Sequence, residues 1–265
     1  MAASPPSIRP AFRKMAPFLI QAAEQSLNEA DTVRRIVKVF EDVLAYDGMT
    51  EISREALVKG KYVDLAIKLD GTTKLLVEIK AAGTVLRDRH IDQARAYAAD
   101  GNIRWVLLTN GTSWNLYHLT FEEGIEHDLV FAIEVAPDRI DEAADALAIL
   151  HRDSVKRALH EELWHRKSAL SPQSLGRALF AESVLRLIRR EVRRSEGVSI
   201  DEEDLVSGIK TLFSPEVREQ MGPIKIRRRK RKRLVQATSG EPASVEEDPT
   251  EVTEERDENS GEESS

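Results

Sequence analysis

Two short apolar runs carry charged residues at positions where a strand would otherwise present apolar side chains. Residues 63–67 contain Asp64, and residues 75–80 contain Glu78 and Lys80. Because side chains alternate between the two faces of a strand, Glu78 and Lys80 share one face, while the apolar residues between them face a core. A fold built on these strands must give the charged face either solvent or a partner of opposite charge.

The turn at Asp70-Gly71 decides whether the two acids meet. A regular two-residue turn would place Asp64 opposite Val77, and Glu78 would then face the other way. A three-residue loop brings Asp64 opposite Glu78 or diagonal to it, and a β-bulge has the same effect. A shared site for the two carboxylates therefore predicts an odd register or a bulge in this hairpin.

Two carboxylates from adjacent strands suit a magnesium ion, which takes one or two carboxylates and keeps several waters. Asp64 and Glu78 are thus candidate metal ligands, and the Ile79 carbonyl is a candidate third. Lys80 could hold an attacking water or stabilise negative charge on a phosphate. With Mg²⁺ or Mn²⁺, these groups suffice to hydrolyse a phosphodiester bond. The alternative is a solvent-facing charge pair on an amphipathic hairpin.

Three further polar residues are candidates for the same site. Gln93 and Tyr97 are four residues apart in a predicted helix and share a face, so they could hold substrate phosphate or a water. The alternative is an ordinary exposed helical pair. Glu29, at the start of the first long predicted helix, could supply another carboxylate. It also suits the first turn of a helix, where acids are favourable.

The pattern of apolar residues predicts an α/β domain followed by a helical region. Helical periods cover residues 28–46, 88–100, 140–150, 155–164, 172–194 and 201–213, and strands are expected at 61–69, 74–81, 104–108, 113–119 and 128–135, with a strand or turn at 52–58. The predicted divisions are a disordered N-terminus (1–10), an α/β domain (11–136), a helical region (137–222) and a disordered charged tail (223–265).

Charge is concentrated near the end of the chain. Eight of the nine residues 225–233 are Lys or Arg, whereas residues 240–265 hold eleven acids and one Arg. The remainder has a net charge of about −5, so nucleic-acid binding would need a local patch or a metal. The basic run is interpreted as a DNA contact, or alternatively as a solubilising or targeting segment. The acidic tail could mask it.

Several classes of protein are excluded or disfavoured. The chain has no cysteine, so it has no disulfide or thiolate metal site. No apolar run is long enough to span a membrane, and we expect a soluble, cytoplasmic protein. The six histidines lack zinc-site spacing and are interpreted as packing or surface residues. No residue is assigned to an organic cofactor.

These residues together resemble the N-terminal nuclease domain of type I restriction enzyme R subunits, in the PD-(D/E)xK nuclease superfamily. The resemblance runs from about Asn28 to Leu119. The residues that carry it are Tyr62-Val63-Asp64, Leu76-Val77-Glu78-Ile79-Lys80-Ala81, Gln93-Ala94-Arg95-Ala96-Tyr97, Trp105-Val106-Leu107-Leu108-Thr109-Asn110-Gly111 and Trp114-Asn115-Leu116-Tyr117.

The resemblance implies a restriction-endonuclease-like mixed β-sheet core flanked by helices. It implies that Asp64 and Glu78 bind the metal, that Lys80 is the catalytic lysine, and that Gln93 and Tyr97 form the auxiliary Gln-x-x-x-Tyr motif. Glu29 matches the family's helix-one acid. The Thr-Asn-Gly…Trp stretch resembles a structural hairpin, the alternative being a DNA-contacting loop.

Two departures from the family pattern stand out. Val63 occupies the position of the proline in the superfamily name, which does not affect metal ligation. The chain also contains no Gly-x-x-x-x-Gly-Lys-Ser/Thr phosphate loop, so a helicase motor would come from a partner. The expected partners are DNA and either motor or specificity subunits or a second copy.

The sequence therefore favours a metal-dependent DNA endonuclease. One alternative is a catalytically silent nucleic-acid-binding or regulatory protein on a nuclease fold. Another is a helical interaction module with the α/β part as scaffold.

Overall fold

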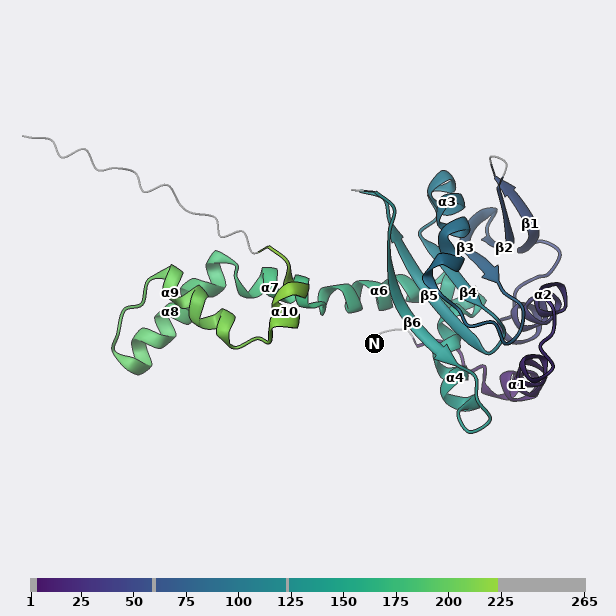
Figure 1. The fold of residues 1–265 in the computed structure, drawn as a ribbon, viewed down its shortest axis with the longest axis horizontal. Helices are drawn as coiled ribbons and strands as arrows, with labels where there is room; N and C mark the ends of the chain where they lie inside the picture. Colours follow the sequence, from purple (N-terminus) through teal and green to yellow (C-terminus); the bar gives the residue numbers. More distant parts are fainter. Residues whose placement is uncertain (1–3, 59–60, 123, 224–265) are drawn as a thin grey trace, which may run out of the picture. The chain divides into compact units, whose positions relative to one another are not determined.

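A six-stranded mixed sheet forms the centre of the fold (Figure 1). The computed structural model describes residues 4–58, 61–122 and 124–223. The strands are β1 (Ile52–Val58), β2 (Lys61–Leu69), β3 (Thr72–Ile79), β4 (Trp105–Thr109), β5 (Ser113–Thr120) and β6 (Glu126–Glu134). With helices packed on it, this sheet confirms the predicted α/β fold class.

The helices fall into two groups along the chain. Those of the first part are α1 (Arg9–Glu24), α2 (Glu29–Lys38), α3 (Asp92–Gly101), α4 (Ile140–Leu147), α5 (Arg152–Lys156) and α6 (Leu159–Ala169). Those of the C-terminal helical region are α7 (Pro172–Leu179), α8 (Glu182–Glu196), α9 (Glu202–Thr211) and α10 (Pro215–Met221). A π-helical turn (Val39–Val43) extends α2, and 3₁₀ turns (Asp88–Ile91 and Ala148–Leu150) precede α3 and follow α4.

The strands lie across the sheet in sequence order, from β1 to β6. All neighbouring pairs are antiparallel except β3 and β4, which are parallel. Parallel strands need a crossover connection, and α3 provides it. The helix packs through Ala94, Tyr97 and Ala98 on a cluster that includes Ala66 and Leu76. It therefore covers the sheet face that carries Ala66 and Leu76. Val63 of β2 belongs to the same cluster, whereas Leu65 lies in the core of the opposite face, so the alternation of β2 is interrupted at Asp64.

The opposite face of the sheet carries the larger core. Leu65 and Ile67 of β2 and Val77 and Ile79 of β3 belong to this cluster, together with buried residues of α1 and α4. The alternation of β3 is thus the predicted one, with apolar odd-numbered residues in the main core. The charged even-numbered positions lie on the α3 side.

The hairpin between β2 and β3 contains the predicted irregularity. Asp70 and Gly71 have positive φ angles of 50° and 75°, as a two-residue type I′ turn requires. The register then shifts between Ile67 and Lys68. The hairpin therefore contains a β-bulge, as one of the two predicted arrangements requires.

The N-terminal helix was not predicted. Residues 1–10 were expected to be disordered, but α1 begins at Arg9, and Ile8 is buried in the main core. Arg9 forms an ion pair with Asp145 of α4. The buried positions of α1 recur with a helical period: Phe12, Ala16, Leu19 and Ala22. An apolar stripe of this kind is buried by packing, and it overrides the weak helical signal of a segment that contains Pro17.

Two predicted helices are interrupted. The period over 155–164 belongs to α5 and α6, which are separated by Ala158 with a positive φ of 57°. The period over 172–194 belongs to α7 and α8, whose break lies at Phe180 and Ala181. Phe180 is buried in a core formed by the C-terminal helices, so the break turns its side chain inward.

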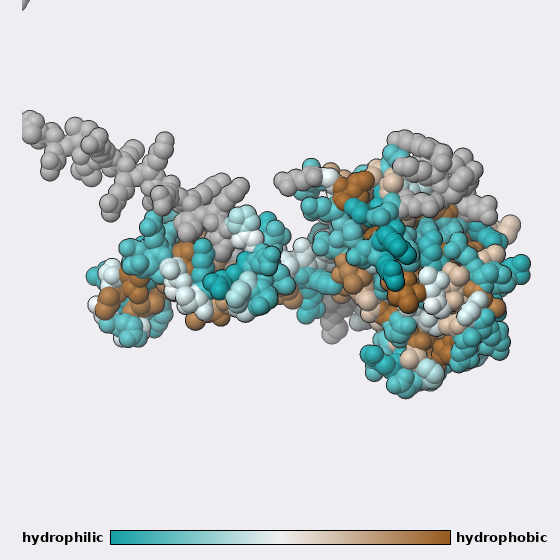
Figure 2. All heavy atoms as spheres, in the orientation of Figure 1, coloured by the Kyte–Doolittle hydropathy of each residue, from teal (hydrophilic) through white to brown (hydrophobic). Residues whose placement is uncertain are grey.

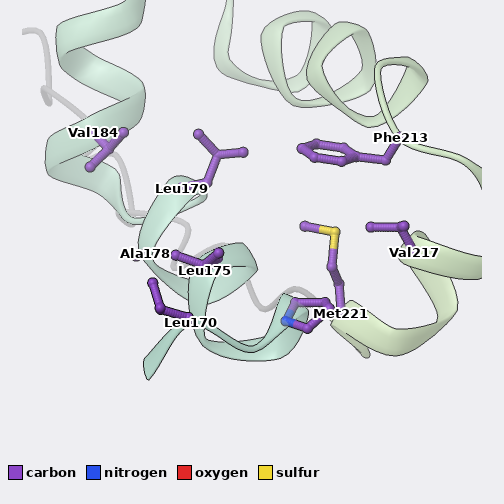
Figure 3. Close-up of a pocket in the computed structure, with 9 residues that line it drawn as sticks. Leu170, Leu175, Ala178, Leu179, Val184, Phe213, Val217 and Met221 are labelled. Atoms are coloured by element: carbon purple, nitrogen blue, oxygen red, sulfur yellow. The ribbon is translucent and has the colours of Figure 1, made fainter. Parts of the chain in front are cut away.

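The helices α7 to α10 enclose a small apolar core of their own. It consists of Phe180, Leu185, Leu205, Val206, Ile209 and Met221. A groove of about 540 Å³ opens beside it, lined by apolar side chains that include Leu175, Phe213 and Val217 (Figure 3). Apolar residues also reach the surface of this region between hydrophilic ones (Figure 2). The basic run and the acidic tail lie outside the described residues.

In the described part of the chain, no helix combines the length and the apolar character needed to cross a membrane. The division between the α/β domain and the helical region at residues 136 and 137 stays a prediction.

Helix α6 contacts the sheet through a cluster of aromatic and histidine rings. Trp105 of β4 lies with its ring centroid 5.0 Å from His118 and 4.8 Å from His160, and His118 stacks on Trp164 at 4.3 Å. Both histidines are buried, which confirms a packing role for these two. Burial lowers the pKa of His118, and it lowers the pKa of His160 to about 4.

Acidification should therefore weaken the fold through these histidines. Above about pH 6.5 neither the folded nor the unfolded state protonates them. Below about pH 6.5, the histidines are protonated in the unfolded state. In the folded state His160 stays neutral down to about pH 4. In that window His160 lowers the free energy of unfolding by about 1.4 kcal/mol per pH unit, and His118 acts in the same direction. Urea denaturation at pH 7 and pH 5 should show a smaller loss for His160→Phe than for the wild type, and equal losses would contradict this assignment.

Candidate functional site

The two acids of the hairpin lie near each other. Beyond the bulge, Leu65 pairs with Val77, and Asp64 and Glu78 are the next residues along the two strands. The charge of Asp64 acts on the Glu78 carboxyl group. The Asp64 carboxylate reaches the backbone of β3, where its Oδ2 accepts a hydrogen bond of 2.7 Å from the Ile79 N–H. This bond fixes Asp64 beside the end of β3.

Lys80 completes the group. Its Nζ lies 2.5 Å from Oε1 of Glu78, and its backbone N–H donates to the Thr109 carbonyl of β4. The Glu78 side chain is only 5% exposed, whereas that of Lys80 is 23% exposed. The ammonium group therefore lies between a buried carboxylate and solvent, where it can contact a ligand.

Glu78 has the most informative pKa of the site. Burial raises this pKa, the hydrogen bond from Lys80 lowers it, and the charge of Asp64 raises it again, giving a value of about 7. The register of the parallel pair places Glu78 beside Leu108, which forms a small apolar cluster with Ile91. This apolar surrounding accounts for the desolvation.

The pKa of Lys80 moves the same way for a different reason. Burial alone would lower it, but the hydrogen bond to Glu78 and the negative charges of Glu78, Glu29 and Asp64 outweigh that effect and raise it. Lys80 is therefore a cation at neutral pH. Its positive charge offsets part of the repulsion between the acids.

Glu29 lies close enough to affect both charged groups on β3. Its charge raises the pKa of Glu78 and that of Lys80. The start of α2 is held at the end of β3, because the Ala82 N–H donates to Thr32 Oγ1 at 3.0 Å. Glu29 is exposed and stands in the first turn of α2. It therefore fits both roles that the sequence left open, a site carboxylate and a favourable helix-start acid.

The two helical residues of the candidate motif both lie on α3. Tyr97 is 3% exposed and packs with Ala66 and Leu76, which lie two residues after Asp64 and two residues before Glu78. Its pKa is raised by burial. The side chain of Gln93 lies outside the described residues, so its predicted role is untested. Tyr97 is thus adjacent to the site and is also a packing residue.

The Thr-Asn-Gly…Trp stretch is built as a structural hairpin. Asn110 is buried, and its Oδ1 accepts hydrogen bonds from the backbone N–H groups of Thr112 and Ser113. The fully buried Trp114 donates through Nε1 to the Gly111 carbonyl at 2.8 Å. These bonds use the polar groups of the turn internally, which favours the structural role over a DNA-contacting loop.

The donor set suits a hard divalent cation. Asp64 and Glu78 provide carboxylates from adjacent strands, and one or two carboxylates are what Mg²⁺ usually takes from a protein. Within the described residues, no group of three or more His, Asp or Glu is arranged as a metal site. The predicted ligand roles of Asp64, Glu78, Ile79 and Glu29 therefore remain predictions.

A basic loop that was not predicted from the sequence follows β3. Arg87, Arg89 and His90 follow β3, and Arg87 and Arg89 are exposed. The pKa of His90 is lowered by burial and then by the charges of Arg89, Lys80 and Arg87. The sequence signal that could have predicted this loop is the presence of three basic residues within ten positions after Lys80.

Comparison with known protein families finds a match over the segment that contains this site. Residues 35–130 match the type I restriction enzyme R protein N terminus (HSDR_N). The resemblance seen in the sequence is confirmed for this segment. The matched residues include Asp64, Glu78, Lys80 and Tyr97, whereas Glu29 precedes them.

Among solved structures, the type IIG restriction endonuclease BpuSI is similar at 21% sequence identity and a TM-score of 0.30. The similarity covers 75% of this chain and 24% of that enzyme, so the chain spans about a quarter of its length. No curated protein matches the chain significantly.

Metal affinity should depend on the protonation of Glu78. Below about pH 7 a proton competes with the metal for this carboxylate, so Mn²⁺ affinity measured by calorimetry should fall about tenfold per pH unit and level off above pH 7. Lys80→Met should move the break to higher pH, because Lys80 lowers the pKa of Glu78. An affinity that is constant from pH 5.5 to pH 8 would contradict Glu78 as a ligand.

Two substitutions separate packing from chemistry at Tyr97. Tyr97→Ala removes a buried ring and should cost about 3–5 kcal/mol of stability. Tyr97→Phe keeps the ring, so its free energy of unfolding should lie within about 1 kcal/mol of the wild-type value. If the hydroxyl group contacts substrate, Tyr97→Phe should still reduce DNA cleavage at least tenfold. Full cleavage activity in Tyr97→Phe would assign this residue to packing alone.

Proposed function

We propose that this protein is a metal-dependent DNA endonuclease of the PD-(D/E)xK type. Two contacts at the end of β3 support the proposal: Asp64 Oδ2 accepts a hydrogen bond from the Ile79 N–H, and Lys80 Nζ lies 2.5 Å from the Glu78 carboxylate. The match to the type I restriction R protein N terminus supports a nuclease-like or restriction function.

Each residue has a role that follows from its position. Asp64, held by the Ile79 N–H, and Glu78 would hold Mg²⁺ or Mn²⁺ through their carboxylates. When bound, the ion would acidify a water and neutralise charge on the phosphate. Lys80 carries its positive charge at the boundary with solvent. There it can orient the attacking water and stabilise the negative charge that grows on the phosphate.

The proposed substrate is DNA, since the matched family is named for a restriction enzyme subunit. Arg87 and Arg89 offer positive charge on the loop that follows β3, and residues 225–233 add more elsewhere in the sequence. The sequence contains no phosphate loop for ATP, so we assign any ATP-driven movement along DNA to another subunit or another part of a longer protein. Specificity subunits or a second copy are the other proposed partners, in the cytoplasm.

Plasmid nicking tests the proposed active site. Supercoiled plasmid is incubated with Mg²⁺ or Mn²⁺ and wild-type protein, Asp64→Ala, Glu78→Gln or Lys80→Ala. Each variant should cut at least about 100-fold more slowly than the wild type, because each loses a metal ligand or the catalytic cation. The matched control is Asp70→Asn, which removes a carboxylate that is 79% exposed on the same hairpin. This control should cut normally, and EDTA should abolish all cutting.

Equal cutting by the wild type and the three site variants would reject this active site. Metal-independent binding of DNA without cutting would instead favour a catalytically silent nucleic-acid-binding protein on the same fold.

A further inference from the structure

Helix α8 presents a basic face that is separate from the proposed active site. Its apolar side packs inward, where Leu185 is buried and Ile188 adjoins the core of the helical region. The opposite side holds Arg186, Arg190, Arg193 and Arg194, all of them exposed. These four arginines, here called the α8 arginine face, are spaced i, i+4, i+7 and i+8, which places them on one side of a helix.

The dimensions of the α8 arginine face suit a charged polymer. Arg186 and Arg194 are eight residues apart, about 12 Å along the axis at about 1.5 Å per residue. That distance equals three or four nucleotide steps of about 3.4 Å along one strand. Arginine also suits phosphate well, because its planar guanidinium can donate two hydrogen bonds to one phosphate group.

Acids within the helix neutralise only part of this charge. Arg186 pairs with Glu182 at 2.6 Å, and Arg194 pairs with Glu191. Arg190 and Arg193 form no ion pair with any residue that the structure describes. Surface pairs like these contribute little to stability and exchange readily with other partners. At least two arginines at the centre of the face are therefore available to an anionic ligand.

We propose that the α8 arginine face binds the phosphodiester backbone of DNA, as a second contact outside the active site. A membrane surface fits less well, because an interfacial helix inserts its apolar side, and that of α8 is already packed in a core. The basic run at residues 225–233 follows α10 closely in the sequence. The inference rests on the proposed function for the identity of the polymer.

The acidic segment of the same chain, residues 240–265, is the competing ligand for the α8 arginine face. Its carboxylates carry charge of the same sign as phosphate. The two ligands predict opposite effects of removing arginines. If DNA occupies the face, the loss of arginines weakens DNA binding. If the acidic segment occupies it, their loss leaves DNA binding unchanged, or strengthens it by releasing a competitor.

The test compares two full-length double variants with the same change in net charge. Arg190→Gln/Arg193→Gln alters the face, and Arg177→Gln/Arg218→Gln alters exposed arginines on α7 and α10. Binding of a fluorescent 30-base-pair duplex is measured by anisotropy in EDTA from 50 to 200 mM salt, so that no metal site is needed. Thermal melts verify that both variants fold.

The face variant should bind DNA at least tenfold more weakly at 100 mM salt, and its log–log salt slope should fall by about 0.9 for each phosphate that it no longer neutralises. The control should change affinity less than twofold. Equal effects of the two variants, or unchanged or tighter binding by the face variant, would overturn the proposal. Weakened binding together with a wild type that never cuts would retain the α8 arginine face as a DNA-binding surface and reject the nuclease.

Discussion

The pairing of β2 with β3 is the constraint on which the proposed site depends. A type I′ turn at Asp70 and Gly71 would by itself direct Asp64 and Glu78 to opposite faces of the sheet. The register shift beside Ile67 changes the pairing, so that Leu65 lies opposite Val77 and the Asp64 carboxylate reaches the Ile79 N–H. One additional residue in the hairpin thus changes which side chains of the two strands meet, because side chains alternate with a period of two. The positions of Lys80 and Tyr97 relative to these acids follow from the same pairing.

The charges of the site are balanced within a small volume. Glu78 is buried beside apolar residues that include Leu108, and burial favours the neutral form of the acid. Lys80 opposes this effect, while Asp64 and Glu29 reinforce it. With two or three acids and a single lysine, the group has an excess of negative charge. A divalent cation would remove that excess, which is a physical reason to expect one there.

Much of this arrangement could be predicted from local patterns. The strand β2 has the predicted bounds, and the alternation of β3 correctly separated its core residues from Glu78 and Lys80. The bulge could be posed only as an alternative, since turn sequence and register are set by packing across strands. The helix α1 was missed because its apolar stripe has meaning only against the sheet that buries it. Leu108 lies beside Glu78 because β3 and β4 pair in parallel, and no local sequence pattern predicts that pairing.

The burial of Glu78 means that folding and chemistry place opposite demands on one position. Its folded pKa of about 7 exceeds the value of about 4.5 expected for an unfolded chain, so ionisation of Glu78 progressively disfavours the folded state as the pH rises between these values. A neutral glutamine of similar shape would avoid that loss. Selection for stability alone would be expected to replace such a carboxylate. The carboxylate at this position therefore lowers stability at neutral pH, and binding of a cation to it would offset that loss.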